Sequence, residues 1–565
     1  MKRIHTLKRT IALFLAMLMA ATSTAFADWD SFQGNSDNNG ISEYGVTEKS
    51  DVLTVTLPND GATTGLDVEP LVYGSRIYAF HNSGKNGPVV TAVDATDGSV
   101  LWSKAVSSGV VEKRDYIANV SQVSTPVIDT DGENLYGVYT YNVDRIYGAQ
   151  TDFYPVTLAV NGGKATASYT GINIPADYTN LQLDTNLVNP AYHPDKPEEN
   201  LTGTATLTNR ETGKKYTFSG SSYEDQNFSL YYSGYPDGPI PAGSYDLEVT
   251  LTNNTSLEVV WRRNRLYTTA WKMFGLSGID GTDPAPISSI DLSGNGQSAS
   301  PLTLVNNKVY FGIFDADCAY FQYDLSTGDS AKFVPGNGNS FYYAGAAVIG
   351  SNVIFGSEDG TVYMRPVDNF ADGQGDESTL TNAGRIRSSI CYDGSEYIYL
   401  TSYNGYLWRI SVADGMLSNE TFVSIGQGGA TNSTSTPTVT ENGMVYAGIY
   451  GYDADYNPIG AVVAVAANEF TAKAPKVTSI YTGDAVQSSP VVYYDEDNGD
   501  IYVYFTTNVS NGTGYCYNTK SVNEPVWKAE SGNYALQGFA MGENDNEDAF
   551  GVFGNDGCQL MIVTA

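Results

Sequence analysis

The sequence is poor in cysteine and histidine, and this scarcity removes several kinds of chemistry. Its four cysteines are Cys318, Cys391, Cys516 and Cys558. They form no Cys-x-x-Cys pair, so neither a zinc site nor a disulfide scaffold is indicated, and we expect small buried side chains. After the N-terminal segment only His81 and His193 remain, each alone. Isolated histidines do not indicate a nucleophilic triad or a histidine-rich metal site.

Basic residues are also scarce. The chain has 30 lysines and arginines against 63 aspartates and glutamates, which gives a formal net charge of −33. Such an excess argues against nucleic acid and against anionic membrane surfaces as partners. It mostly serves solubility in an exported protein, and it favours neutral or cationic partners.

Long apolar runs are absent except for IALFLAMLMAA at residues 11–21. Four basic residues precede this run, and Ala25-Phe26-Ala27 follows it before Asp28. The pattern predicts a cleaved secretory signal over residues 1–27, and hence a protein that is secreted or at the cell surface. An uncleaved anchor is the alternative, although the run is shorter than the roughly 20 residues that span a bilayer. We expect no membrane segment in the mature chain.

Helical periodicity is nearly absent from the rest of the chain. Apolar and polar residues alternate in short runs instead, as in LTVTL, where Leu53, Val55 and Leu57 share one side. Turn formers separate these runs, and the chain contains 58 glycines. The pattern predicts an all-β protein.

Eight related units follow one another along the chain. Each has a small residue, a strand, a polar turn and a second strand. They begin near residues 70, 126, 301, 346, 389, 437, 490 and 538. The steps are 43 to 56 residues long except one of 175, and such a period predicts the blades of a β-propeller. We expect eight blades, with seven as the alternative; an unclosed string of hairpins would leave aggregation-prone edges.

One segment between two strands, TAVDATDGSVLWS, carries a family resemblance. Through Ala92, Asp94, Gly98 and Trp102 it resembles the tryptophan-docking repeat of PQQ-like (quinoprotein-type) β-propellers, although Asp97 stands where that repeat has threonine. The resemblance implies that the tryptophan packs between neighbouring blades. DWDSFQGN near residue 30 also resembles the Trp-x-x-Phe-x-Gly segment that precedes such propellers.

Residues 151–264 differ in sequence pattern from the propeller parts at 28–150 and 265–565. Alternating strands lie close together here and predict an inserted β-sandwich. PAGSYDLEVTL within this range resembles immunoglobulin-like and fibronectin-like modules. WRRNR, at 261–265, marks either a ligand patch or arginines that pair with carboxylates at the domain junction; we favour the pairing.

Quinoprotein dehydrogenases pair adjacent cysteines against the quinone, hold calcium with carboxylates and amides, and use an aspartate base. This chain has no adjacent cysteines, and no acidic residue matches the base or the metal ligands. We therefore expect no PQQ. Calcium has one candidate site, Asp495, Asp497 and Asp500 of DEDNGD, where an Asn-Gly turn is expected in any case.

Taken together, the residues favour a secreted bacterial propeller that binds or scaffolds an extracellular protein or glycan as a monomer and without catalysis. No catalytic residue is assigned. The alternatives are a PQQ-type quinoprotein dehydrogenase and a carboxylate-dependent glycan-active enzyme, since paired carboxylates cannot be recognised in one dimension. The last unit also offers only about three strands, so we expect LTVTL to supply its fourth and to close the ring.

Overall fold

The computed structural model describes the chain in segments. These are residues 29–59, 65–83, 87–106, 115–129, 131–147, 156–159, 164–174, 180–188, 202–221, 228–233, 240–252, 258–315, 317–336 and 338–565. Within them the chain forms β-strands and three short 3₁₀ turns, namely η1 (Phe32–Gly34), η4 (Ala413–Gly415) and η5 (Ala467–Thr471). No helix of these segments is long and apolar enough to cross a membrane.

The strands of the described segments form eight sheets, numbered here from the N-terminal side. Sheet 1 contains β3 (Leu71–Tyr73), β4 (Arg76–Asn82), β5 (Pro88–Asp94) and β6 (Val100–Ala105). Sheet 2 contains β7 (Asp115–Val123), β8 (Val127–Ile128), β9 (Asn134–Tyr147), β17 (Glu258–Ser277), β18 (Ala285–Pro286) and β19 (Ser293–Asn295), together with the insert. Sheet 3 contains β20 (Thr303–Val305), β21 (Lys308–Gly312), β22 (Tyr320–Asp324) and β23 (Ser330–Phe333). Sheet 4 contains β24 (Ala347–Ile349), β25 (Asn352–Gly356), β26 (Thr361–Pro366) and β27 (Asp376–Thr379).

Sheets 5 to 8 continue the same antiparallel pattern. Sheet 5 contains β28 (Cys391–Tyr392), β29 (Tyr397–Ser402), β30 (Tyr406–Ser411) and β31 (Ser418–Ser424). Sheet 6 contains β32 (Thr438–Val439), β33 (Met444–Tyr452), β34 (Pro458–Ala466) and β35 (Thr478–Gly483). Sheet 7 contains β36 (Val491–Asp495), β37 (Asp500–Thr506), β38 (Thr513–Asn518) and β39 (Trp527–Glu530), with β1 (Ile41–Ser42) parallel to β36. Sheet 8 contains β40 (Ala540–Glu543), β41 (Ala549–Asn555), β42 (Gln559–Thr564) and β2 (Asp51–Thr56).

Buried apolar clusters join each sheet to the next and sheet 8 back to sheet 1. Trp271 of sheet 2 packs against Phe311 of sheet 3 with ring centroids 5.4 Å apart, and Tyr320 of sheet 3 stacks on Phe355 of sheet 4 at 3.9 Å. Because the series of clusters returns to its start, the sheets form a ring with no open side. The predicted all-β propeller fold is confirmed.

The ring closes through the N-terminal strand β2, as expected from LTVTL. It pairs antiparallel with β42, with Leu53 opposite Ile562 and Val55 opposite Leu560. Val55 is buried in the cluster shared by sheets 7, 8 and 1. Strand β2 and the C-terminal strands therefore complete one sheet together, which gives sheet 8 four strands, as in sheet 1.

Residues 29–42 fill the centre of this ring. Asn38 Nδ2 donates to the carbonyls of Ala346 and Ile390, at 2.8 and 2.9 Å, at the start of sheets 4 and 5. On other sides the Trp29 backbone pairs with Val72 of sheet 1, and β1 runs along β36 of sheet 7. Backbone and side-chain bonds thus tie one short segment to sheets on several sides of the axis. We call residues 29–42 the plug.

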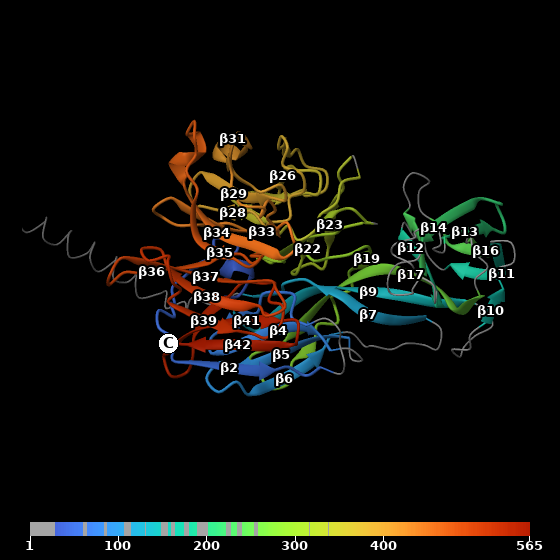
Figure 1. Ribbon diagram of the computed structural model, residues 1–565, viewed down its shortest axis with the longest axis horizontal. Coiled ribbons are helices and arrows are strands. Elements are labelled where there is room, and N and C mark those ends of the chain that lie inside the picture. The colour runs from blue at the N-terminus through green and yellow to red at the C-terminus, as the bar shows by residue number, and fades with distance from the viewer. Residues whose placement is uncertain are drawn as a thin grey trace, which may run out of the picture.

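The ring has two faces. In each antiparallel sheet the turn between the first and second strands and the turn between the third and fourth strands lie on one face of the ring, here named the hairpin face. The connection between the second and third strands lies on the other face. The insert occupies the second connection of sheet 2, between β9 and β17, so the opposite face is named the insert face. Figure 1 shows the insert projecting to the right of the ring along β9 and β17.

The insert continues the hydrogen bonding of sheet 2. Its described strands are β10 (Val156–Ala159), β11 (Lys164–Ile174), β12 (Asn180–Val188), β13 (Thr202–Asn209), β14 (Lys215–Ser221), β15 (Phe228–Ser233) and β16 (Gly243–Thr252). Strand β17 pairs with β12 and β10 at one end and with β9 from Asn264 to Ser277 at the other. The sequence-derived boundary at residue 264 therefore falls inside a continuous strand.

Tyr245 of the insert donates from its hydroxyl to the carbonyl of Pro241 at 2.6 Å. A hydrogen bond of this kind, from a tyrosine entering a strand back to the chain just before it, occurs in immunoglobulin-type sandwiches. Tyr245 and its neighbours Tyr216 and Phe218 are buried. The relation to such modules stays a prediction. The WRRNR motif lies in β17, and its side chains lie outside the described residues.

We expect the ring to fold without the insert. Tyr147 and Asn264 are direct partners across β9 and β17, so replacing residues 148–263 by Asn-Gly would give a two-residue hairpin of favoured geometry. The excised protein should be monomeric and should melt close to the parent temperature in a thermal unfolding scan. A cut that also removes residues 140–147 and their partners serves as the contrast, because it takes the buried Thr140 and Trp271 from the ring. An insoluble short excision would show that ring and insert share a core.

Candidate functional site

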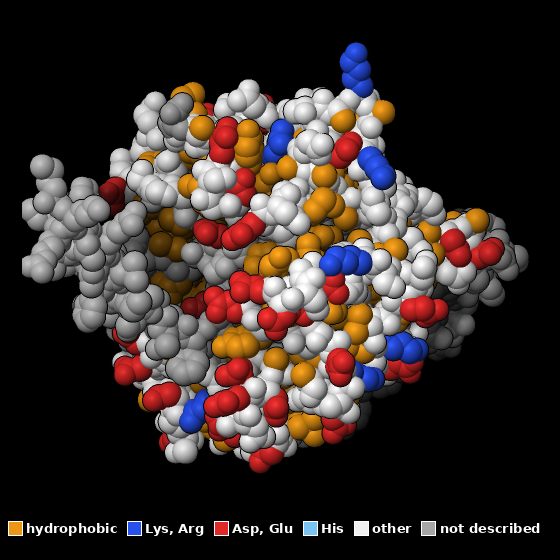
Figure 2. Space-filling model, turned by 90° about the vertical axis from the view of Figure 1, so that its left-hand side faces the viewer, with side chains coloured by type: hydrophobic (Ala, Val, Ile, Leu, Met, Phe, Trp, Pro, Cys, Tyr) orange, Lys and Arg blue, Asp and Glu red, His pale blue; other side chains and the backbone are white. Residues whose placement is uncertain are grey.

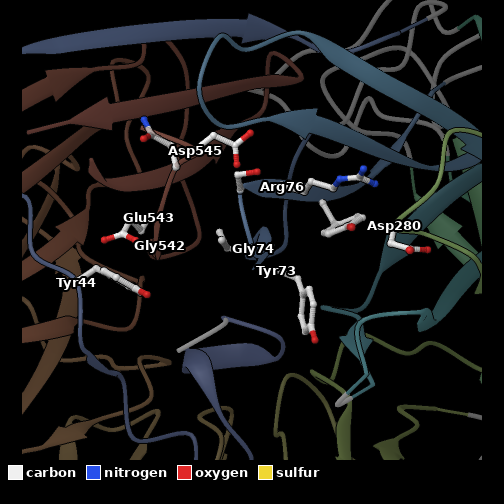
Figure 3. A pocket seen from close by; sticks show the side chains of 12 residues that line it. Tyr44, Tyr73, Gly74, Arg76, Asp280, Gly542, Glu543 and Asp545 are labelled. Atoms are coloured by element: carbon white, nitrogen blue, oxygen red, sulfur yellow. The ribbon is translucent and has the colours of Figure 1, made fainter. Parts of the chain in front are cut away.

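The candidate site is a pocket of about 380 Å³ on the hairpin face. It lies where the first turn of sheet 1 meets the first turn of sheet 8. Tyr73, Gly74 and Arg76 come from the β3–β4 turn, and Glu543 and Asp545 from the β40–β41 turn. Figure 3 shows Tyr44 and Glu543 on one side of the pocket and Arg76 and Asp280 on the other, with Tyr73 and Gly74 between them. We call it the hairpin pocket.

Local sequence places these side chains. Gly74 has a φ of +57°, a conformation that favours glycine and lets β3 turn into β4 within two residues. In the other turn the Asn544 side chain accepts from the backbone of Asn546 and of Asp548, at 2.9 and 3.0 Å. The Asn544 bonds fix the β40–β41 turn from within, and Glu543 and Asp545 on either side of Asn544 line the pocket.

Charge in the hairpin pocket is predominantly negative. Three carboxylates line it, from Asp280, Glu543 and Asp545, against a single cation. That cation, Arg76, donates from Nη1 to the carbonyls of Ile279 and Gly281, each at 3.2 Å. Because these Arg76 bonds go to backbone carbonyls, the three carboxylates can attract a cationic group of a ligand.

Tyrosine rings form the apolar part of the same pocket. Tyr44, Tyr73 and Tyr78 line it, and burial raises the pKa of Tyr78 to about 12, so that its ring stays neutral. Neutral aromatic faces attract cations through the ring quadrupole. Tyrosines and carboxylates together suit an ammonium or guanidinium group.

The tryptophan motif lies beside sheet 2, and Trp102 belongs to the buried cluster that sheets 1 and 2 share. Trp102 is 7% exposed and donates from Nε1 to the carbonyl of Ile279, which follows the third strand of sheet 2, at 3.2 Å. Ala92 is buried behind it. Asp94 accepts from the Thr96 backbone at 2.8 Å, and Gly98 has a φ of +72°. The motif shapes a turn and seats an indole between sheets 1 and 2, which is a structural role.

The calcium candidate forms the β36–β37 turn. Asp495 accepts from the backbone of Asp497 at 3.0 Å and from Nδ2 of Asn498 at 2.7 Å. Asp500 pairs with Lys520, whose hydrogen bond lowers the pKa of that carboxyl, and also accepts from Asn518 at 2.7 Å. Local donors thus engage two of the three carboxylates. Within the described residues, no three His, Cys, Asp or Glu side chains lie together in a way that could hold a metal ion.

The residues also do not fit the quinone cofactor of the family that the repeat resembles. None of the four cysteines forms a disulfide, and Cys391, Cys516 and Cys558 lie buried in separate sheets or turns. His81 is buried with Nε2 2.9 Å from Thr91 Oγ1, and burial lowers its pKa to about 4, so that it stays neutral. His193 lies outside the described residues. No adjacent thiols and no carboxylate set converge in the described chain to hold a quinone with calcium.

Comparison with known proteins adds little beyond the fold. No protein-family model and no curated protein matches the chain. Among solved structures, BamB from Moraxella catarrhalis is 11% identical, with a TM-score of 0.43 over 91% of this chain and 98% of its own. A europium-containing methanol dehydrogenase is 10% identical, with a TM-score of 0.47 over 95% and 98%. A quinohemoprotein alcohol dehydrogenase from Pseudomonas putida is 10% identical, with a TM-score of 0.47 over 95% and 80%. These values are too low to carry a functional argument.

Proposed function

We propose that this chain is an exported, non-catalytic binding propeller, monomeric by itself, that holds a partner protein outside the cell through the hairpin face. The observation that carries the proposal is the hairpin pocket, in which three carboxylates and three tyrosines surround one cation whose donors are partly used. A lysine or arginine side chain of the partner is the group that this lining complements.

The surrounding surface supports the same partner. Figure 2 shows the side on which the β36–β37 turn lies in Figure 1, and there the acidic side chains clearly outnumber the basic ones. A surface of one sign draws an oppositely charged segment toward it and speeds association at low ionic strength. The proposal therefore includes weaker binding at high salt.

The test compares a fluorescent peptide of alternating lysine and glycine with the same peptide acetylated on its lysines, since acetylation removes only the charge. The parent protein should bind the cationic peptide and not the acetylated one. The double variant Glu543→Gln/Asp545→Asn should weaken binding by roughly fivefold, because two partly exposed charge contacts together supply on the order of 1 kcal/mol. Fluorescence anisotropy at two salt concentrations measures both effects.

Glu441→Gln/Asp497→Asn is the matched control, because it removes two exposed carboxylates from other turns of the same face. It should leave binding nearly unchanged. Equal losses in both double variants would reduce the interaction to diffuse surface charge and would refute the pocket as the binding site. Equal binding of the acetylated peptide would refute the cationic partner.

A further inference from the structure

A second pocket, of about 250 Å³, lies on the axis of the ring toward the insert face. Each of the eight sheets contributes to its wall through the segment that leads into its first strand, from Val68 for sheet 1 to Gln537 for sheet 8. Phe32 of the plug lines it from within the ring. We call it the axial pocket. It is separate from the hairpin pocket and shares no residue with it.

Arg387 is the one cation of this wall. Its Nε and Nη2 donate to the two carboxylate oxygens of Glu358, each at 2.8 Å. The guanidinium carbon lies 4.9 Å from the ring centroid of Tyr342 and 5.9 Å from that of Tyr403. The side chain is thereby fixed, with its charge balanced. The bonds to Glu358 leave the two hydrogens of Nη1 and the second hydrogen of Nη2 as donors that Arg387 can offer to the pocket.

Tyr343 lines the same pocket in a strained backbone conformation. Its φ is +61°, in the left-handed region that bulky residues rarely adopt, which costs on the order of 1 to 3 kcal/mol. Burial raises the pKa of its phenol well above the ordinary value, so the hydroxyl keeps its proton. Strain of this size collects at ligand sites, where it holds a side chain in one position.

Three amide side chains of the lining offer donors and acceptors. Asn508 donates from Nδ2 to Oε1 of Gln487 at 2.5 Å, and Gln537 donates from Nε2 to the carbonyl of Asp67 at 2.6 Å. These bonds leave the Gln487 amino group as a donor and the Asn508 and Gln537 amide oxygens as acceptors. A hydroxyl is the ligand group that both donates and accepts. A carboxylate, which only accepts, would leave the two amide oxygens unmatched.

From this lining we propose that the axial pocket binds one uncharged, polyhydroxylated ring of monosaccharide size, with Arg387 Nη1, Tyr343 and the three amides bonding its hydroxyls. Apolar Phe32 and Leu536 offer surface to the C–H side of the ring. The volume falls below the roughly 300 to 1,000 Å³ of pockets for drug-sized ligands, so it admits a single ring. A free sugar and the end of a glycan share this chemistry.

The experiment titrates the full mature protein with neutral hexoses, pentoses and N-acetylhexosamines in calorimetry, and repeats the titration with their methyl glycosides and short oligosaccharides. We expect at least one neutral sugar to bind. Binding of the oligosaccharide as tightly as the single unit identifies a glycan end, and loss of binding with the longer ligand identifies a free sugar. Acetate and PQQ with calcium are run beside them.

Arg387→Met should weaken sugar binding at least about tenfold, the usual effect of losing a charged hydrogen bond of roughly 1.4 kcal/mol. Arg385→Met is the matched control, because Arg385 lies 3.5 Å from the same Glu358 but does not line the pocket. The control should bind within about twofold of the parent. Leu536→Trp, which narrows the pocket and keeps the Arg387–Glu358 pair, should also weaken binding, and it should keep the parental unfolding temperature without ligand.

Failure of every neutral sugar to bind would overturn the proposal, as would binding of acetate or PQQ in their place. An equal loss in Arg385→Met and Arg387→Met would also overturn it, because the effect would then come from the ion-pair cluster and not from the pocket. None of these results bears on the hairpin pocket, where the peptide test decides alone.

Discussion

A chain without residues 29–60 is expected to lose the closed ring. The deletion removes the plug and strand β2, so β42 becomes an exposed edge with unpaired backbone groups, and edges of this kind promote pairing between chains. We expect the truncated protein to be oligomeric or insoluble and to lack a cooperative thermal transition near that of the parent. Light scattering and thermal unfolding measure the two effects.

Glu69 makes this loss larger than that of an ordinary terminal tail. Its side chain is fully buried and accepts from Nε1 of Trp29 at 2.8 Å, and from the backbone N and Nε2 of Gln33 at 2.9 and 3.2 Å. All three donors belong to the plug. Leaving a buried polar group without its hydrogen-bond partners costs about 1 to 3 kcal/mol, against a total stability of about 5 to 15 kcal/mol for a domain.

Point variants separate the contribution of β2 from that of the plug. Val55→Asp places a charge in the buried cluster of sheets 7, 8 and 1, and should lower the free energy of unfolding by about 3 kcal/mol or more. Thr56→Asp is the control, because the neighbouring side chain is exposed on the same strand. A truncated chain that stays monomeric and melts like the parent would refute closure by this segment.

Part of this architecture could be predicted because it depends on residues that are close together in the sequence. The alternation of Leu53, Val55 and Leu57 fixes which side of a strand is apolar, and an incomplete last unit needs a fourth strand. The turn chemistry of Asp94 and Gly98 likewise predicted the connection before Trp102. These features can be predicted from residues adjacent in the sequence, or from the number of strands in each unit.

The pockets could not be predicted, because each joins turns that are distant in sequence. Tyr73 and Glu543 meet only because the ring brings the first unit beside the last, and no motif marks either residue. The aligned positions of the YGSR and GEND turns in their units were the available signal. No sequence pattern marks Arg387 as a pocket residue, because a single arginine in a loop usually lies on the solvent-exposed surface.

The continuity of the insert with sheet 2 was missed for a different reason. Alternation predicts a strand but not the sheet to which it belongs. In hindsight, residues 258–274 contain no glycine or proline, so no turn signal separates the insert from the ring. The 20-residue length of β17 follows from that absence.

Ring closure should weaken as pH rises from about 4 to about 7, because of a carboxyl pair next to the closing strand. Asp67, in the segment between β2 and β3, shares a hydrogen bond with Asp556 of the β41–β42 turn. Burial, followed by the charge and hydrogen bond of Asp556, raises the pKa of Asp67 to about 7, and burial also raises the pKa of Asp556. The other titratable groups facing the pair, Tyr343 and Cys558, have raised pKa values too and stay uncharged.

The direction follows from proton binding. Below the ordinary pKa of 3.8 both the folded and the unfolded chain keep the Asp67 proton, so the shift has no effect on stability. As pH rises toward 7 the unfolded chain releases this proton while the folded chain retains it, and the free energy of unfolding falls. The shift corresponds to about 4 kcal/mol at most, and coupling within the pair divides that amount between two carboxyls.

Asp67→Asn should remove this penalty, because an amide can donate to the Asp556 carboxylate at any pH. The variant should match the parent near pH 4 and exceed it by about 2 kcal/mol or more at pH 8, in urea titrations at both pH values. Asp455→Asn, an exposed turn position on the insert face, is the control and should change neither value. Because other carboxylates change stability with pH as well, the quantity that decides is the difference between variant and parent. If that difference is the same at pH 4 and pH 8, the two carboxyls share no proton in the folded ring.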